Sequence, residues 1–283
     1  MKKQITPCLW YDGQAKNAAA LYCSVFTDSK ITAQSPIVTE IELSGQKFIL
    51  LDGGPIYKPN PSISFYYICE NDEELNTIWN AFSQEGKVMM PLDKYPWGEK
   101  YGWITDMFGV SWQLALGNMS DVGQRITPCL MFTGDQYGRV DEAIAHYSSI
   151  FKDPKVDGVL RYGEGEAPDE EGKVKHAQIA LDGQKFMLME SKETHDFTFT
   201  EGVSLTVYCE TQEEIDYYWE RFTEGGEESM CGWLKDRFGV SWQIVPTALE
   251  KILSDPAKAG KAAQAFMSMR KLDIEQIVQA SLS

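Results

Sequence analysis

The sequence GWITDMFGVSWQ at Gly102–Gln113 occurs a second time as GWLKDRFGVSWQ at Gly232–Gln243. Nine of the twelve positions are identical, and the two copies lie 130 residues apart. An internal repeat with so long a period indicates that the chain consists of two similar parts. The 283 residues are enough for two domains of ordinary size.

The residues of this stretch predict a turn that leads into a strand. The carboxylate of Asp106 can accept a hydrogen bond from the backbone two residues further on, and Gly109 suits a turn position with unusual backbone angles. The next six residues alternate between two faces: Val110, Trp112 and Leu114 on one, Ser111, Gln113 and Ala115 on the other. We therefore expect an aromatic hairpin whose last strand carries one amide on its more polar face.

Further repeats extend the pattern over most of the chain. The pentapeptide ITPCL begins each half, at Ile5–Leu9 and Ile126–Leu130. Apolar residues at helical spacing follow it, and helices capped by Asn71 and Thr211 occur later in each half. Each half reads as two β-α-β-β-β units. The predicted fold is α+β: four such units in two tandem domains, residues 1–120 and 121–246, with a helical tail at 247–283 that packs on the second domain.

The spacing between the repeats changes along the chain, which locates the insertions. The second half gains residues near Asp135–Tyr137 and in an acidic loop at Gly163–Gly172, and the first half gains ten residues around Lys87–Lys100. Loops are where two copies can diverge in ligand access or in partner. Neutral drift of the loops explains the insertions equally well.

Composition argues against several classes of partner. The net charge of −16 disfavours nucleic-acid binding. No apolar run approaches the roughly 18 residues of a membrane span, and the first residues contain no signal-peptide core. The six cysteines form no CxxC pair, so we expect reduced thiols in a cytoplasmic protein.

The residues themselves assign no reaction. His146, His176 and His195 lack the spacing of metal ligands, and the chain has no glycine-rich dinucleotide or phosphate loop. The acidic residues of the 163–172 loop lack the EF-hand pattern and read as a solvated loop. We therefore predict no catalytic residue, no metal and no cofactor.

Paired β-α-β-β-β units, together with ITPCL, LxGQKF and GWxxDxFGVSWQ, resemble the vicinal-oxygen-chelate (glyoxalase/bleomycin-resistance) superfamily. More narrowly, they are similar to the PhnB-like branch, which also carries a 3-demethylubiquinone-9 3-methyltransferase name. The resemblance implies that two units lie side by side, that their sheets curl around a cleft, and that the fused copies form an internal pseudo-dimer. Further homo-oligomer formation stays open.

The resemblance also implies where metal-using members hold their ion. The matching positions, give or take a residue, are Pro7, Leu50, Ser64 and Gln113 in the first copy and Pro128, Leu188, Ser204 and Gln243 in the second. Proline and leucine cannot ligate a cation, and neutral serine and glutamine are poor ligands. The sequence thus predicts the scaffold without the metal centre.

The leading hypothesis is a metal-free protein with clefts that bind small molecules. Its cleft-facing candidates are Leu9, Tyr11, Ser64, Tyr66, Ser111, Gln113, Leu130, Phe132, Ser204, Thr206, Ser241 and Gln243. Gln113 and Gln243 would orient a ligand through both amide groups. Two alternatives stay open: a glyoxalase-type lyase, dioxygenase or methyltransferase, and an assembly module whose clefts are filled by their own side chains.

Overall fold

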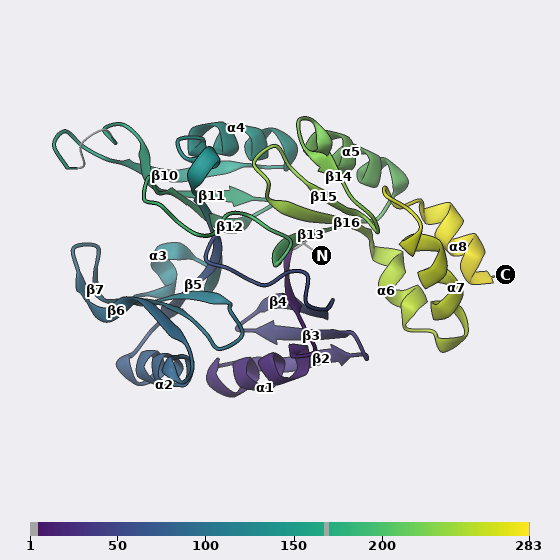
Figure 1. Cartoon of the computed structure of the whole chain (residues 1–283), viewed down its shortest axis with the longest axis horizontal. Coiled ribbons are helices and arrows are strands. Elements are labelled where there is room, and N and C mark those ends of the chain that lie inside the picture. Colours follow the sequence, from purple (N-terminus) through teal and green to yellow (C-terminus); the bar gives the residue numbers. More distant parts are fainter. Residues whose placement is uncertain (1–4, 167–169, 283) are drawn as a thin grey trace. The chain divides into compact units, whose positions relative to one another are not determined.

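The computed structural model describes residues 5–166 and 170–282 (Figure 1). Its contacts divide the chain into two compact units. One unit is Cys8–Val203, and the other combines the start of the chain, up to Pro7, with Ser204–Ser283.

Both halves of the first copy have the predicted order of one strand, one helix and three strands. The first half contains β1 (Thr6–Tyr11), α1 (Ala15–Val25), β2 (Ser29–Gln34), β3 (Val38–Leu43) and β4 (Gln46–Asp52). The second half contains β5 (Ile63–Cys69), α2 (Asp72–Ser83), β6 (Lys87–Tyr95), β7 (Gly98–Thr105) and β8 (Ser111–Leu116). The short helix α3 (Met119–Val122) connects this copy to the next.

The second copy repeats the order and adds the predicted helical tail. Its first half contains β9 (Ile126–Phe132), the 3-10 turn η1 (Gly134–Gln136), α4 (Val140–Ile150), β10 (Lys155–Arg161), β11 (Val174–Leu181) and β12 (Gln184–Glu190). Its second half contains β13 (Val203–Cys209), α5 (Gln212–Thr223), β14 (Glu227–Glu228), β15 (Trp233–Lys235) and β16 (Ser241–Pro246). The tail consists of α6 (Thr247–Leu253), α7 (Pro256–Met267) and α8 (Ile274–Leu282).

The unit Cys8–Val203 contains an eight-stranded sheet that mixes the two copies. Its strand order is β10-β11-β12-β9-β5-β8-β7-β6. The junction is the antiparallel pair of β5 and β9, in which Ser64 faces Cys129 and Tyr66 faces Thr127. The second half of the first copy therefore shares a sheet with the first half of the second copy.

Aromatic side chains form the core between α1, α2 and the strands of the first copy. Trp112 of β8 lies 5.4 Å from Tyr22 of α1 and 5.5 Å from Phe82 of α2, measured between ring centroids. Phe48 of β4 lies 5.0 Å from Phe65 of β5 in the same way. This core fixes which face of β5 and β8 points toward the helices.

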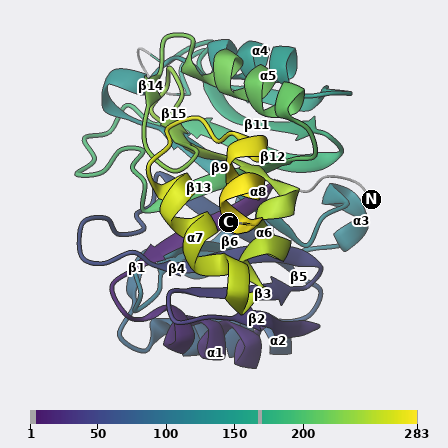
Figure 2. The same ribbon diagram turned by 90° about the vertical axis from the view of Figure 1, so that its right-hand side faces the viewer.

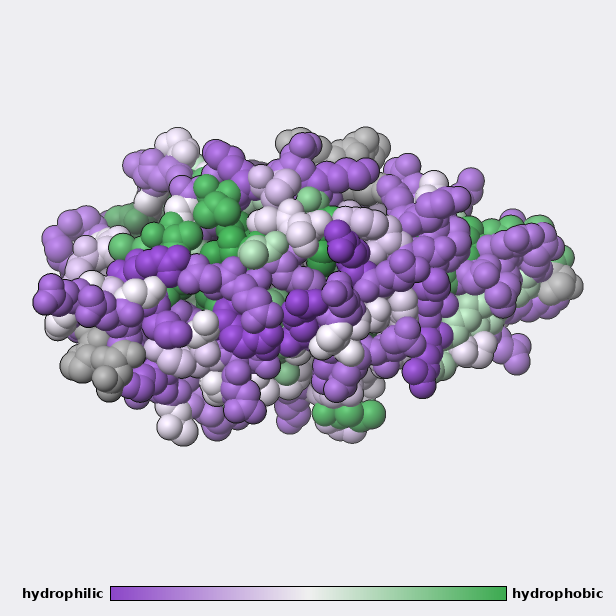
Figure 3. Space-filling view, turned by 90° about the horizontal axis from the view of Figure 1, so that it is seen from above, coloured by the Kyte–Doolittle hydropathy of each residue, from purple (hydrophilic) through white to green (hydrophobic). Residues whose placement is uncertain are grey.

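The unit with Ser204–Ser283 has strands in the order β14-β15-β16-β13. Helix α5 covers one face, where Phe222 stacks on Trp242 at 4.4 Å. The tail helices pack together around Ala262 and Ile277 and reach Val245 of β16 (Figure 2). The tail thus packs on strands of the second copy. Leu253, Met267 and Leu282 of the tail are exposed, and Figure 3 shows green, apolar surface over the tail.

No helix within residues 5–166 and 170–282 is long and apolar enough to cross a membrane.

Candidate functional site

The carboxylate of the repeated GWxxDxFGVSWQ motif organises its own hairpin. Asp106 Oδ1 accepts hydrogen bonds from the backbone N–H groups of Phe108 and Val110. Asp106 Oδ2 accepts from Trp112 Nε1 at 2.9 Å and from the Tyr22 hydroxyl at 2.8 Å. Burial raises the pKa of Asp106 to about 6, against the four donors, which lower it. The predicted turn is confirmed, and the carboxylate is fully used in holding it.

The candidate site in the eight-stranded sheet lies on the face opposite that core, which we name the Gln113 face. In-register pairs place Ser64 beside Ser111 and Tyr66 beside Gln113, and paired residues share a face. The structure therefore brings these four residues together on one face.

Hydrogen bonds connect the polar side chains of the Gln113 face to one another. Gln113 Nε2 donates to Ser64 Oγ at 2.8 Å, and Gln113 Oε1 accepts from the Tyr101 hydroxyl at 2.8 Å. Ser111 Oγ accepts from Trp103 Nε1 at 2.7 Å. The amide therefore already has a partner on each side.

Apolar and aromatic side chains surround this polar centre. Tyr101, Trp103, Ala115 and Met131 form a buried cluster. Partly buried residues pack against it: Tyr66, Met89, Met90, Tyr95, Met189 and Phe197. Such a surface, apolar with a few fixed polar groups, suits an organic molecule.

Leu130 and Phe132 lie on the other face, which corrects their predicted orientation. Ser64 pairs with Cys129, whereas Leu130 pairs with Ile63. Because successive strand residues point to opposite faces, Cys129 and Met131 belong to the Gln113 face.

Leu9 and Tyr11 are corrected in the same way. The Tyr11 hydroxyl lies 3.2 Å from the hydroxyl of Tyr22 on α1, and burial raises the pKa of Tyr11 well above its usual value. Leu9 shares that helix-facing side, being two residues away on β1. The error in all four cases is one residue of strand register.

The same register changes the residues that stand beside Ser64 and Gln113. Cys129 pairs with both Ser64 and Met187, so Cys129 and Met187 of the second copy stand beside Ser64 and Gln113, where Pro7 and Leu50 of the first copy were expected. Burial raises the pKa of the Cys129 thiol to about 12, so it is a neutral thiol at physiological pH. A thiol, a thioether, a hydroxyl and an amide do not fit a hard divalent cation.

Histidine and carboxylate side chains do not assemble a metal site either. Within residues 5–166 and 170–282, no three His, Cys, Asp or Glu side chains gather as metal ligands would. Burial lowers the pKa of His176, and His195 Nε2 lies 2.8 Å from Ser191 Oγ. In the acidic loop Glu166 pairs with Lys175, while Asp169 lies outside the described residues.

The unit with Ser204–Ser283 carries a matching surface, which we name the Gln243 face. Ser204 pairs with Ser241 and Thr206 with Gln243, and Gln243 Nε2 donates to Ser204 Oγ at 2.8 Å. All four predicted residues share this face.

Two buried hydroxyls of the Gln243 face lack a hydrogen-bond partner among the described residues. Thr206 and Ser241 are each 1% exposed. Their hydroxyl oxygens have no hydrogen-bond partner among the described residues. On the Gln113 face the same is true of Thr127, whereas Ser111, the match of Ser241, is bonded to Trp103. The Gln243 face therefore has more unused hydrogen-bonding capacity.

Sequence reasoning missed the residues that complete the Gln113 face. Trp103 belongs to the repeated stretch and Tyr101 directly precedes it, and their alternation with Gly102 would have placed both on the face of Gln113. Cys129 and Met131 required the register of β9 against β5, which no local signal supplies.

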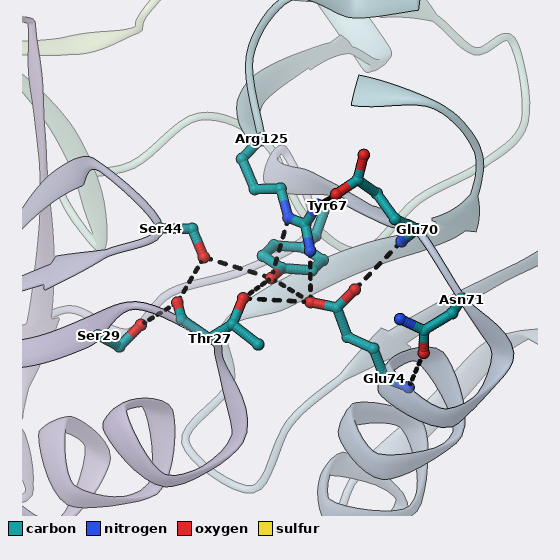
Figure 4. Close-up of polar contacts among 8 residues, drawn as sticks. All are labelled: Thr27, Ser29, Ser44, Tyr67, Glu70, Asn71, Glu74 and Arg125. Carbon is teal, nitrogen blue, oxygen red and sulfur yellow. Dashed lines mark hydrogen bonds and ion pairs between the residues drawn. The ribbon is translucent and has the colours of Figure 1, made fainter. Parts of the chain in front are cut away.

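A second polar cluster lies at the helix-facing end of β5 (Figure 4). Arg125 donates to Glu70 at 2.8 Å, to Glu74 at 2.6 Å and to the Tyr67 hydroxyl at 3.2 Å. Tyr67 in turn donates to Glu74. Because Arg125 directly precedes β9, we assign this cluster to anchoring the connection between the copies.

The two copies of paired β-α-β-β-β modules define a glyoxalase-like protein of the vicinal-oxygen-chelate superfamily. Glyoxalase I from Zea mays shares this fold: the TM-score is 0.57 at 12% identity, over 90% of this chain and 97% of that chain. The chain belongs to the family described as 3-demethylubiquinone-9 3-methyltransferase, the PhnB-like branch, which matches residues 3–115 and 124–245.

Individual relatives cover single copies. A PhnB protein from Bacillus cereus is 32% identical, over 41% of this chain and 100% of that chain, with a TM-score of 0.39. A Pseudomonas aeruginosa protein is 23% identical, over 40% of this chain and 96% of that chain, with a TM-score of 0.36. No curated protein matches the chain.

Proposed function

We propose that this protein binds a small organic molecule on the Gln243 face without a metal ion. The observation that carries the proposal is the pair of buried, unpartnered hydroxyls of Thr206 and Ser241. Leaving such groups without hydrogen bonds costs about 1–3 kcal/mol each. A ligand that hydrogen-bonds to both would recover that cost.

The chemistry of the face indicates the class of ligand. A hydroxyl both donates and accepts, and an amide offers one group of each kind. Carboxamides, carboxylic acids and alcohols on an apolar body match this arrangement. On the Gln113 face a ligand would first have to displace the bonds from Tyr101 and Trp103.

Two other activities are alternatives to be tested. A glyoxalase-type reaction would need a divalent cation, for which the side chains beside Gln113 are poor ligands. Methyl transfer, as the family name describes, would need a methyl donor, and the sequence contains no nucleoside-binding glycine loop.

Thermal unfolding with benzamide as the probe tests the binding proposal. We expect a saturable rise in the midpoint that persists in a chelator. Thr206→Val combined with Ser241→Ala should abolish the rise, because both hydroxyls are lost. Ser111→Ala, the matched change on the Gln113 face, should leave the rise in place.

The opposite results would reject the proposal. Equal stabilisation of the double variant would place the probe elsewhere. Retention of stoichiometric zinc, nickel, manganese or iron by the purified protein, with loss of stability in chelator, would favour the metalloenzyme.

A further inference from the structure

In the first copy, a residue of hairpin β6–β7 covers the end of the Gln113 face. Tyr101 lies opposite Ala115 and hydrogen-bonds to Gln113. The preceding Lys100 is tied to α2, with its Nζ atom 2.6 Å from Asp72 and 3.1 Å from Asn76. Tyr101, which forms this cover, is part of β7 and is fixed by the backbone hydrogen bonds between β7 and β8.

The second copy lacks this cover. Cys231 matches Tyr101 in the repeat, but β15 begins only at Trp233. Cys231 and Gly232 both have positive φ angles, 61° and 81°. The chain therefore turns away from the sheet where the first copy continues as a strand.

A segment of the tail, Met269–Ile274, is bonded to this gap; we name it the strap. The backbone N–H of Cys231 donates to Met269 O at 2.7 Å, and that of Gly232 donates to Arg270 O at 2.8 Å. A side chain at position 232 would meet Leu272 at 3.1 Å. The strap and the strand end are thus in direct contact.

The strap reproduces the contacts of Lys100 and Tyr101. Lys271 Nζ lies 2.6 Å from Asp216, which matches Asn76 in the repeat. Leu272, only 1% exposed, packs in one cluster with Val245, the match of Ala115. Lys271 thus corresponds to Lys100, and Leu272 corresponds to Tyr101 in apolar packing but not in the hydrogen bond to the amide.

Gln212, the match of Asp72, holds the strap by its backbone. Its Nε2 donates to Leu272 O at 3.1 Å, and its Oε1 accepts from Ile274 N at 2.9 Å. The amide of Gln212 thus holds the strap through two hydrogen bonds to its backbone, without the backbone hydrogen bonds of a β-sheet.

We propose that the strap is a removable cover of the Gln243 face, which stands in for the fixed cover of the first copy. It opens without unfolding of the strands, because a few side-chain and backbone bonds hold it. The proposal rests on the proposed function only in what the opened face admits.

Alkylation of a partly buried cysteine measures the opening. In the full-length chain, Val245→Cys places a thiol against the apolar cluster that contains Leu272, and iodoacetamide labelling of that peptide is followed by mass spectrometry. Adding Gln212→Ala removes both grips on the strap, and we expect about tenfold faster labelling. The urea midpoint of the strands should stay unchanged.

The first copy supplies the matched control. Ala115→Cys places a thiol under Tyr101, and Asp72→Ala removes the counterpart of Gln212. Because the cover there is a sheet strand, labelling should change less than about twofold.

The outcomes distinguish the proposal about the strap from the proposal about the ligand site. Two results would overturn the proposal that the strap opens. One is an equal labelling rate with and without Gln212→Ala, and the other is a labelling rate that rises only in parallel with global unfolding. Fast labelling without any stabilisation by benzamide would support the strap while rejecting the proposed ligand site.

Discussion

At the scale of the residue, the Asp106 carboxylate links three elements through its hydrogen bonds. It joins the turn after β7, the indole of Trp112 on β8 and the hydroxyl of Tyr22 on α1. The residue type follows from this geometry, because a short ionisable acceptor can serve four donors at once. Its burial makes the same group sensitive to pH.

Asp106→Asn should change how stability depends on pH. Burial raises the folded pKa from 3.8 to about 6, so the folded chain binds more protons between these values. The stability that Asp106 contributes is therefore full below about pH 4 and falls as pH rises through about 6, by roughly 1.4 kcal/mol per unit of pKa difference. Urea unfolding of the wild type and of Asp106→Asn at pH 4 to 8 measures the difference in their free energies of unfolding. This difference, wild type minus variant, should not increase as the pH rises.

Thr206→Val should stabilise the protein in the absence of ligand. The variant keeps the shape of the side chain and removes an unpaired buried hydroxyl, which should add about 1 kcal/mol to the free energy of unfolding. Ser204→Ala is the matched control. It deprives Gln243 of its acceptor and should cost about 1–2 kcal/mol. Destabilisation by Thr206→Val would mean that the hydroxyl has a partner in solution.

At the scale of the element, the start of β9 is fixed by the Arg125 cluster (Figure 4). Arg125 O also accepts from the backbone N–H of Ile68 on β5. Both the side chain and the backbone of this residue therefore guide β9 to its place beside β5.

Arg125→Met should lower the free energy of unfolding by about 3–5 kcal/mol, because it leaves the buried Glu74 carboxylate without its counter-charge. The side chains of Arg125 and Glu74 are 12% and 7% exposed. Arg139→Met is the control: its pair with Glu142 is more exposed and lies within one helix turn, so the cost should be at most about 1 kcal/mol. Chemical denaturation measures both losses in the free energy of unfolding. Equal losses for the two variants would show that the Arg125 cluster does not anchor β9.

At the scale of the molecule, one sheet combines strands from both copies of the repeat. β5 of the first copy pairs with β9 of the second. An isolated first copy would present β5 as an unpaired edge, and exposed edges recruit other strands. Its own β1, the counterpart of β9 in the repeat, is the matching strand.

Residues 1–123 expressed alone should therefore self-associate. We expect a dimer by light scattering, in which β5 of one chain pairs with β1 of the other, while the full-length chain is the reference. A stable, folded monomer of this fragment would show that the β5 edge needs no partner.

The sequence predicted the local elements because their signals are local. The carboxylate and glycine of Asp106–Gly109 set the turn, and the alternation from Val110 onward set which side of β8 carries Gln113. The predicted orientation was wrong for Leu9, Tyr11, Leu130 and Phe132, because each strand is apolar on both faces and its alternation is hidden.

By itself, the sequence determined four modules and their repeat. Only the tertiary structure decided that strands of different copies share a sheet and that Cys129 stands beside Ser64. It also decided that Leu272 of the tail packs in one cluster with Val245 of β16. The physical reason is that propensity and periodicity act over a few residues, whereas strand partners and the covers of a face are selected by packing between distant segments.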